Sequence, residues 1–319
     1  MRHCAVSPVP GASRVPARFI DKAGNVESMT AEDRTAQLRR ADVRRRFDRA
    51  AAGFENADFV HRTMREGLLA RLEPMQLDAR IVVDAGAGIG AAGDALARRF
   101  RGARVIAVDL SLAMLRRLRL GGGWFSARPA VQADACRLPL ADGTVDVIFA
   151  NLLLPWIDDP EQFFREAARV LRKEGLLVFS TLGPDSLLAL RRAWQRANGD
   201  EGGHVHRFLD MHVIGDAAVR SGLRDPVLDV DRLTVTYASA ADLFRDLSAA
   251  GARNCLAGRR AALTGRRRFE AMRSALEASA CAAPIAVGLE LVFGHCWGSG
   301  SAAAGGEIRV DATRIPRRR

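Results

Sequence analysis

A glycine-rich turn between two apolar segments constrains the fold of this chain more than any other feature. Residues 81–90 read Ile-Val-Val-Asp-Ala-Gly-Ala-Gly-Ile-Gly, and residues 105–109 read Val-Ile-Ala-Val-Asp. This order predicts a buried strand, a tight turn, a helix start and a second strand that ends in an acid. Such a unit is typical of α/β folds, and its acid, Asp109, can accept hydrogen bonds from two ribose hydroxyls.

The spacing of the glycines indicates which ligand the turn suits. Gly86, Gly88 and Gly90 are spaced as G-x-G-x-G, whereas dinucleotide binders carry G-x-G-x-x-G. Each glycine lets the backbone approach a ligand where a Cβ would collide. A pyrophosphate needs a helix N-terminus presented to it, but S-adenosylmethionine has no pyrophosphate and carries a sulfonium. The spacing therefore favours S-adenosylmethionine over NAD; the alternative is a glycine-rich turn in another kind of α/β protein.

Length and composition exclude several classes of protein. With 319 residues, 48% of them hydrophobic, the chain can build one large α/β domain with an elaboration, or two small ones. No apolar run reaches the roughly 18 residues that span a bilayer, so we expect no membrane attachment. The five cysteines are scattered, without a Cys-x-x-Cys pair or a neighbouring histidine cluster. We therefore expect no metal site, no disulfide framework and a cytoplasmic location.

The net charge of +11 is not read as a nucleic-acid signal. Only Lys22 and Lys173 are lysines, so the other 46 of the 48 basic residues are arginines, a skew typical of a GC-rich genome. Aromatic residues that could stack on bases are not interleaved with the basic ones. A surface rich in arginine instead favours an acidic protein partner.

Strands and helices alternate after the glycine turn. This alternation predicts a parallel sheet with right-handed crossovers. Apolar patterning predicts strands near 80–85, 103–109, 129–133, 145–150, 175–182, 227–237 and 285–296. Helices are expected near 30–72, 90–101, 111–119, 159–172, 209–221 and, in large part, 240–278.

Six segments are expected along the chain, and Met29 is a candidate for the true start. Pro8, Pro10 and Pro16 interrupt a first segment without hydrophobic periodicity, which predicts disorder there. In order, the segments are a disordered extension (1–28), a helical segment (29–78), the cofactor-binding core (79–238), a helical lid insertion (239–283), a closing strand (284–298) and a flexible basic tail (299–319).

Polar residues follow two further strands of the predicted sheet. Asp134 comes after the third strand, where it can meet the exocyclic amine of adenine or cap a helix. Asn151 follows the fourth strand, and ligands of open α/β sheets bind at this carboxyl end. Trp156, a little further on, either walls a substrate channel or belongs to the core. Gly175 is expected to end the helix before the fifth strand.

The order of these motifs resembles that of class I S-adenosylmethionine-dependent methyltransferases, across about residues 80 to 185. A narrower likeness is to the malonyl-acyl-carrier-protein O-methyltransferases of biotin synthesis, across roughly residues 42 to 315. It is carried by Phe47-Asp-Arg-Ala-Ala51, Asn151-Leu-Leu-Leu-Pro-Trp156, Ser180-Thr-Leu-Gly-Pro-Asp-Ser-Leu187, Arg207-Phe-Leu-Asp-Met211, Gly251-Ala-Arg-Asn254 with Gly258-Arg259, and Val292-Phe-Gly-His-Cys-Trp297. One departure is Phe54, where this family often carries tyrosine.

The resemblance implies a Rossmann-like, mostly parallel seven-stranded sheet flanked by helices, with a helical lid. It implies methyl transfer from S-adenosylmethionine to the free carboxylate of a malonyl group on an acidic acyl carrier protein, by a chain that we expect to be a monomer. The expected cofactor-binding residues are Asp84, Gly86, Gly88, Gly90, Asp109, Leu110, Asp134, Ala135 and Asn151. The substrate-binding candidates are Arg253, Arg259, Arg260 and Trp156.

No general base is expected, because a carboxylate with a pKa near 4 is already ionised at pH 7. Three alternatives stay open on the sequence. The first is a related S-adenosylmethionine-dependent protein that hydroxylates arginine or helps to assemble a respiratory complex. The second is a small-molecule methyltransferase, and the third is a non-enzymatic binding module.

Overall fold

The computed structural model describes residues 37–121, 128–198, 203–259, 264–278 and 284–300. It also describes two short antiparallel strands, β1 (Phe19–Ile20) and β2 (Val26–Glu27). The rest of the expected N-terminal extension, the tail beyond residue 300 and the candidate Arg260 lie outside the described residues.

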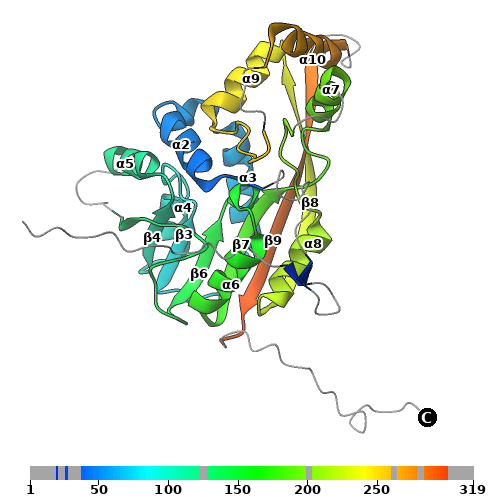
Figure 1. The fold of residues 1–319 in the computed structure, drawn as a ribbon. Coiled ribbons are helices and arrows are strands. Elements are labelled where there is room, and N and C mark those ends of the chain that lie inside the picture. Colours follow the sequence, from blue (N-terminus) through cyan, green and yellow to red (C-terminus); the bar gives the residue numbers. More distant parts are fainter. Residues whose placement is uncertain are drawn as a thin grey trace, which may run out of the picture.

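One seven-stranded sheet organises the molecule, with strand order β5-β4-β3-β6-β7-β9-β8 (Figure 1). β3 pairs in parallel with β4 and β6, and the parallel pairing continues to β5 on one side and β7 on the other, whereas β9 is antiparallel to both of its neighbours. The prediction of a mostly parallel seven-stranded sheet is confirmed. The bounds are β3 Ile81–Ala85, β4 Arg104–Asp109, β5 Ala130–Gln132, β6 Val145–Ala150, β7 Leu171–Leu182, β8 Leu223–Tyr237 and β9 Ile285–Gly298.

Helices cover both faces of this sheet, because successive strand residues point to opposite faces and both sets are apolar. On one face α6 (Pro160–Val170) and α8 (Met211–Arg220) pack with Val83 and its neighbours. On the other face α3 (Phe59–Leu72) and α4 (Gly93–Arg99) pack with Val82 and its neighbours. The buried strands therefore read as continuous apolar runs.

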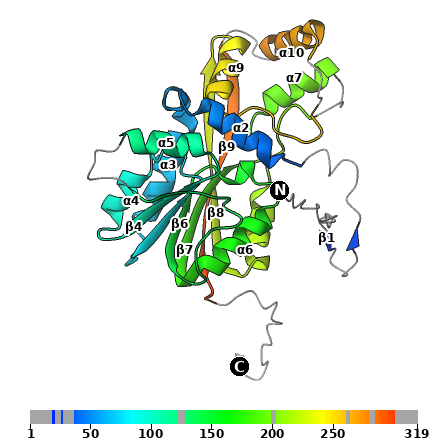
Figure 2. The ribbon, with the colours of Figure 1, turned by 60° about the vertical axis from the view of Figure 1, so that its left-hand side comes forward.

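Three helices form a separate cluster around the far ends of β8 and β9, at the top of Figures 1 and 2. They are α7 (Leu188–Asn198), α9 (Ala240–Ala249) and α10 (Arg266–Ala278). No helix is predicted over 188–198, although Leu190, Ala193 and Trp194 are buried there at the spacing of one helical face. The other two helices lie in the segment expected to be a helical insertion.

The N-terminal helical stretch is divided into α2 (Arg40–Ala50), a 3₁₀ turn η1 (Phe54–Ala57) and α3. A single helix could not bury both of its apolar patches, because they face different neighbours. The end of α2 packs with Met114 of α5 (Leu112–Gly121), whereas α3 packs on the sheet. The division brings α2 across the carboxyl ends of the strands (Figure 2).

The expectation that Gly175 ends a helix is wrong. α6 ends at Val170, and β7 begins at the next residue. The pairing of β6 with β7 is irregular between Val145 and Val147, and Gly175 lies at this irregularity. A Cβ on Gly175 would lie 2.9 Å from the carbonyl oxygen of Arg172 and 3.0 Å from that of Val145. Glycine is needed there for the close approach of two backbones.

Within the described part of the chain, none of the helices has the length and apolar character needed to cross a membrane. The same residues contain no group of three or more His, Cys, Asp or Glu side chains that could hold a metal ion.

Candidate functional site

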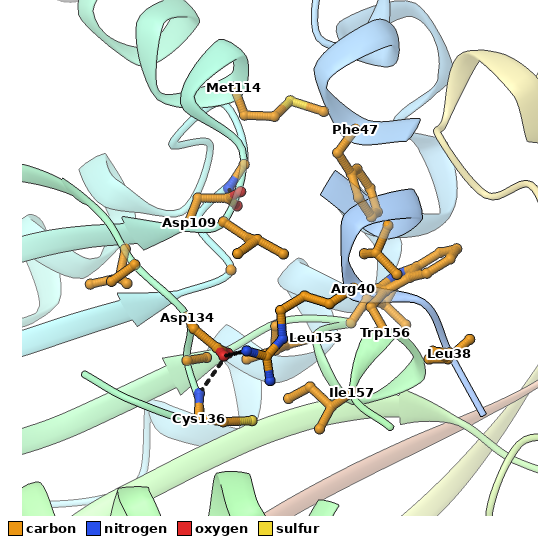
Figure 3. Close-up of a pocket in the computed structure, with 18 of the residues that line it drawn as sticks. Leu38, Arg40, Phe47, Asp109, Met114, Asp134, Cys136, Leu153, Trp156 and Ile157 are labelled. Carbon is orange, nitrogen blue, oxygen red and sulfur yellow. Dashed lines mark hydrogen bonds and ion pairs between the residues drawn. The ribbon is translucent and has the colours of Figure 1, made fainter. Parts of the chain in front are cut away.

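A cavity of about 340 Å³ opens at the carboxyl ends of the parallel strands. The strand order reverses at β3, which lies between β4 and β6, and ligands of open α/β sheets bind at such a reversal. Four strand ends contribute to the wall, and Figure 3 shows part of it. These residues are Gly86, Gly88, Val108, Asp109, Leu110, Ala133, Asp134, Ala135, Asn151, Leu152 and Leu153.

Asp109 is the acid at the tip of β4, and its carboxylate is fixed in place by backbone donors. Oδ2 accepts a hydrogen bond from the amide of Gly88 at 2.8 Å, and Oδ1 accepts one from the amide of Ser111 at 2.7 Å. Burial raises the pKa of Asp109, while these amide hydrogen bonds act in the opposite direction. Each oxygen retains lone-pair capacity for a further donor, so the carboxylate can bind two hydroxyls at once.

The glycine turn wraps over the end of β4. The amides of Gly86 and Ala87 both donate to the carbonyl oxygen of Val108, at 2.8 and 3.0 Å. Gly88 has φ +56°, and no atom lies within 4 Å of the position that a Cβ would take. Since Gly88 lines the cavity, that open space belongs to the ligand side of the turn.

Replacing Gly88 by alanine is expected to reduce cofactor affinity at least tenfold, because the methyl group would project into the cavity. The positive φ adds a folding cost of about 1 kcal/mol. Gly143 is the matched control, since it has φ +63°, equally open space, and no place in the cavity. Calorimetric titration with S-adenosylmethionine checks the difference. Equal affinities of Gly88→Ala and Gly143→Ala would show that the turn does not touch the ligand.

Asp134 lies across the cavity from Asp109 (Figure 3). Its Oδ1 accepts a hydrogen bond from the Cys136 amide at 3.0 Å, and its Oδ2 forms an ion pair with Arg40 of α2 at 2.6 Å. The bond to the Cys136 amide closes a turn and caps no helix, because the next element after β5 is the strand β6. Of the two roles that the sequence offers for Asp134, only the position on the cavity wall is therefore found. Arg40 connects the N-terminal helix to the wall.

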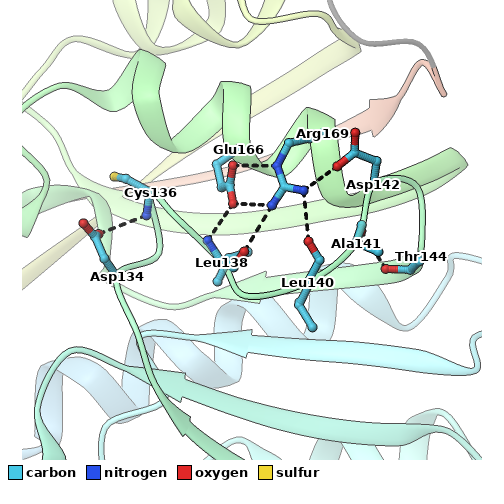
Figure 4. A network of polar contacts seen from close by, with 9 residues as sticks. All are labelled: Asp134, Cys136, Leu138, Leu140, Ala141, Asp142, Thr144, Glu166 and Arg169. Carbon is cyan, nitrogen blue, oxygen red and sulfur yellow. Dashed lines mark hydrogen bonds and ion pairs between the residues drawn. The ribbon is translucent and has the colours of Figure 1, made fainter.

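A polar network holds the loop that follows Asp134 against α6 (Figure 4). Glu166 accepts a hydrogen bond from the Leu138 amide at 2.6 Å. Arg169 donates to Glu166 and to the carbonyl oxygens of Leu138 and Leu140, at 3.1 and 2.9 Å for the carbonyls. The loop is thereby fixed at several points, which sets the position of the Asp134 turn.

Two of the expected cofactor-binding residues, Asp84 and Gly90, do not line the cavity. Asp84 is only 3% exposed, and burial, reinforced by the charge of Asp109, raises its pKa to about 7. Gly90 faces α5, where a Cβ would collide with Leu118. Asp84 lies in β3 just before the turn, and Gly90 packs the end of the turn against α5.

Asn151 does line the cavity, but its amide group also joins two elements. Its Oδ1 accepts a hydrogen bond from the Ser180 hydroxyl at 2.9 Å, and its Nδ2 donates to the carbonyl oxygen of His61 at 3.0 Å. Asn151 thus ties the tip of β6 to both β7 and α3.

A second cavity, of about 570 Å³, adjoins the first. His61, Leu152 and Trp156 line both. Trp156 packs edge-on against Phe47 and His206, with ring centroids 5.0 and 5.2 Å apart. Trp156 therefore forms part of the wall between the cavities. Most of the second cavity is apolar, with Leu182, Leu187, Leu190, Trp194, Val205, Phe208, Val235, Leu243, Phe244, Phe269, Val287 and Leu289 in its lining.

Three arginines line the second cavity: Arg46, Arg253 and Arg259. Arg259 forms an ion pair with Asp42, a carboxylate of α2 that is 5% exposed. Arg46 and Arg253 form no ion pair with a described residue. Two cationic side chains of this cavity are thus available to a ligand among the residues that the structure describes.

The sequence analysis did not identify the residues that α2, α3 and the η2 turn (Leu154–Trp156) bring to the first cavity, apart from Trp156. Their types, mostly apolar residues on helices, are the same as those of ordinary core positions, so only the fold distinguishes them. Arg40 had no distinguishing signal either, because arginine is frequent along the whole chain. The residues missed, some of them from neighbouring turns and from α5, include Leu38, Arg40, Val43, Phe47, Phe54, His61, Met114, Cys136 and Ile157.

Known proteins are similar to this chain over most of its length. Residues 83–179 match the family described as "Methyltransferase domain". A malonyl-[acyl-carrier protein] O-methyltransferase of Methylovorus sp. (strain MP688) is 41% identical over 266 residues, which cover 81% of this chain and 88% of the relative. The protein of the same name from Halorhodospira halophila is 40% identical over 284 residues, covering 87% and 95%. The YcgJ protein of Bacillus subtilis has a similar fold, with a TM-score of 0.52, 16% identity, and coverage of 73% of this chain and 97% of its own.

Proposed function

Because this chain belongs to the malonyl-[acyl-carrier protein] O-methyltransferase family, we propose that its two adjoining cavities bring a methyl donor and a malonyl thioester together. The protein transfers a methyl group from S-adenosylmethionine to the free carboxylate of malonyl-acyl carrier protein, the step that primes pimeloyl synthesis for biotin. The alternatives left open by the sequence are not favoured by relatives of this identity and coverage.

The wall shared by the two cavities is the structural observation that best supports this function. A transfer between two ligands needs both in one enclosed space, with the donor and acceptor atoms in line. His61, Leu152 and Trp156 lie where the two spaces meet. The two reacting groups would meet at this junction.

The first cavity suits S-adenosylmethionine in its donor set. Asp109 would accept hydrogen bonds from the ribose hydroxyls, and Asp134 would accept one from the adenine amine. Leu110, Ala135 and Met114 offer apolar surface for the base. The backbone of the turn at Gly88 would face the methionyl portion, where no side chain intervenes.

The reaction needs no general acid or general base from the protein. When bound, S-adenosylmethionine supplies an electrophilic methyl group on its sulfonium, which a malonyl carboxylate oxygen takes as the neutral thioether S-adenosylhomocysteine leaves. The carboxylate is already ionised at neutral pH, so no residue has to remove a proton. The contribution of this chain is to orient the two reactants and to exclude water. Orientation can lower the activation free energy by about 7–11 kcal/mol in favourable cases.

The second cavity would hold the malonyl thioester and the end of the carrier's prosthetic arm. Its apolar lining excludes water from the thioester, while Arg46 and Arg253 provide positive charge. Arg253 is exposed and lies in the segment after α9, so it can also meet an acidic carrier protein at the surface. Arg259 would act indirectly, by holding this segment onto α2.

We place the enzyme in the cytoplasm as a monomer. The argument for a monomer is that residues of a single chain line both cavities. The argument for the cytoplasm is that the cysteines Cys136, Cys255 and Cys296 are free.

Methyl transfer from labelled S-adenosylmethionine to malonyl-acyl carrier protein tests the function. Acetyl-acyl carrier protein is the control, because it lacks the free carboxylate and is otherwise the same thioester. Label is expected on the malonyl form alone. Absence of label from both forms, with the cofactor bound, would contradict the function; label on both would contradict carboxyl transfer.

A further inference from the structure

His61 is a polar side chain on the wall common to the two cavities. The other two residues of that wall are Leu152, which is apolar, and Trp156, which offers only an indole N–H. His61 lies near the start of α3 and faces the tip of β6 through Asn151. It therefore occupies the place where the two reacting groups meet.

The backbone and the ring of His61 are each fixed by a separate contact. The backbone carbonyl oxygen of His61 accepts the hydrogen bond from Asn151, which in turn is held by Ser180. The ring packs edge-on against Phe54, with centroids 4.9 Å apart. Phe54 has no hydroxyl group, so His61 supplies the polar atoms of this pair of rings.

One nitrogen of the His61 imidazole has no partner in the described part of the protein. The atom is Nδ1, which is shielded from solvent. A buried polar group without a partner costs about 1–3 kcal/mol. His206, which lines only the second cavity, shows the contrast, because its Nε2 accepts a hydrogen bond from the Cys255 amide at 3.0 Å. The fold thus uses a ring nitrogen of His206, whereas one ring nitrogen of His61, a residue that lines both cavities, has no partner in the described part of the protein.

Burial lowers the pKa of His61 to about 4, so the ring is neutral at pH 7. A neutral imidazole donates one hydrogen bond and carries no charge. A carboxylate held in this way stays a free anion, whereas an ion pair would also stabilise the negative charge that the reaction consumes. A neutral donor thus orients the nucleophile with little loss of its reactivity.

We propose that His61 donates a hydrogen bond to the free carboxylate of the malonyl group and directs it toward the methyl donor. This role rests on the function proposed above. It gives the enzyme a means of distinguishing malonyl from acetyl thioesters, because the second lacks the acceptor. The methyl ester that forms has lost its charge and accepts a hydrogen bond more weakly, which favours release of the product.

The test compares two substitutions of His61, each assayed with two acyl carrier protein thioesters. His61→Leu removes the donor, and His61→Gln restores an N–H of similar reach. For each variant, kcat/KM is measured with malonyl-acyl carrier protein, and the inhibition constant is measured for acetyl-acyl carrier protein as a competitor. His61→Leu is expected to reduce kcat/KM about 10- to 100-fold and to leave the inhibition constant within about threefold. His61→Gln should recover part of the loss.

Two results would overturn the role. Equal weakening of the malonyl and acetyl forms would show that His61 only shapes the wall. A lower affinity for S-adenosylmethionine by calorimetry, with malonyl kinetics otherwise unchanged, would show that the carboxylate held is that of the cofactor. His212→Leu is the matched control, because His212 is an exposed histidine that lines neither cavity.

The wild-type enzyme separates this inference from the function. Turnover of malonyl-acyl carrier protein by the wild type establishes the reaction whatever the His61 variants do. If His61→Leu does not fold, as judged by its thermal transition, His61→Gln and the conservative His61→Asn carry the comparison between the two thioesters.

Discussion

Replacement of Asp109 by alanine is expected to weaken S-adenosylmethionine binding by roughly 10²- to 10⁴-fold. The carboxylate lies half-buried at the end of β4, and the amides of Gly88 and Ser111 fix its orientation at 2.8 and 2.7 Å. Two hydroxyls bound to a fixed carboxylate would contribute about 1.5–3 kcal/mol each. Calorimetric titration of the variant with the cofactor measures the loss.

Two controls isolate the ribose contact from damage to the turn. Asp109→Asn retains one oxygen acceptor and should lose less affinity than Asp109→Ala. Asp94→Ala removes an acid of α4 whose side chain is 75% exposed, and should bind as the wild type does. Undiminished affinity of Asp109→Ala, with an unchanged thermal transition, would contradict the assignment of this cavity to the cofactor.

Replacement of Arg259 by alanine is expected to lower the free energy of unfolding by about 1–3 kcal/mol. Arg259 and Arg45 both form ion pairs with Asp42, whose side chain is shielded from solvent. The same segment is joined to the chain before α2 by a bridge between Leu38 and Leu256 and by the Arg39 amide, which donates to the Cys255 carbonyl at 3.0 Å. Chemical unfolding at pH 7 measures the loss.

Arg253→Ala is the matched control for Arg259→Ala, because Arg253 is exposed and has no ion pair with a described residue. Its stability should stay within about 0.5 kcal/mol of the wild type, whereas its KM for the carrier protein should rise. Equal stability of the two variants would show that the Arg259–Asp42 pair does not anchor the segment.

The stability difference should also depend on pH. Burial alone would raise the pKa of Asp42, but the hydrogen bonds and charges of Arg45 and Arg259 hold it below its ordinary value. A carboxyl whose pKa is lowered in the folded state contributes stability above its unfolded pKa, and the contribution is lost as the pH falls through the folded value. The gap between wild type and Arg259→Ala should therefore narrow as the pH falls below about 4.

The sheet could be predicted from the sequence because its strands are continuous apolar runs. The expected strands near 80–85, 103–109 and 145–150 agree with β3, β4 and β6 within a residue or two. A strand buried on both faces has no other stable place in a soluble fold. The ends of helices were less predictable, since Gly175 was expected to end α6 and in fact serves a close approach of two backbones.

The sequence also limited what could be said of the arginines. Arg253 and Arg259 are alike in type and lie close together in the chain, so the sequence alone could not distinguish their roles. The fold separates them, because Asp42 of α2 meets Arg259 and leaves Arg253 exposed. Arg46, which lies on α2 and was not a candidate, reaches the same cavity.

The sequence by itself determined the glycine turn, Asp109 at the next strand end, and the ligand class that they suit, because these parts are neighbours in the chain and a parallel sheet brings them to one edge. Only the tertiary structure decided what covers that edge. Arg40, Phe47 and His61 come from helices that fold across the strand ends, and the second cavity is closed by elements from the other half of the chain. Such contacts depend on how segments that are distant in the sequence pack together. Local residue patterns predict single elements and do not indicate which of their surfaces will be in contact.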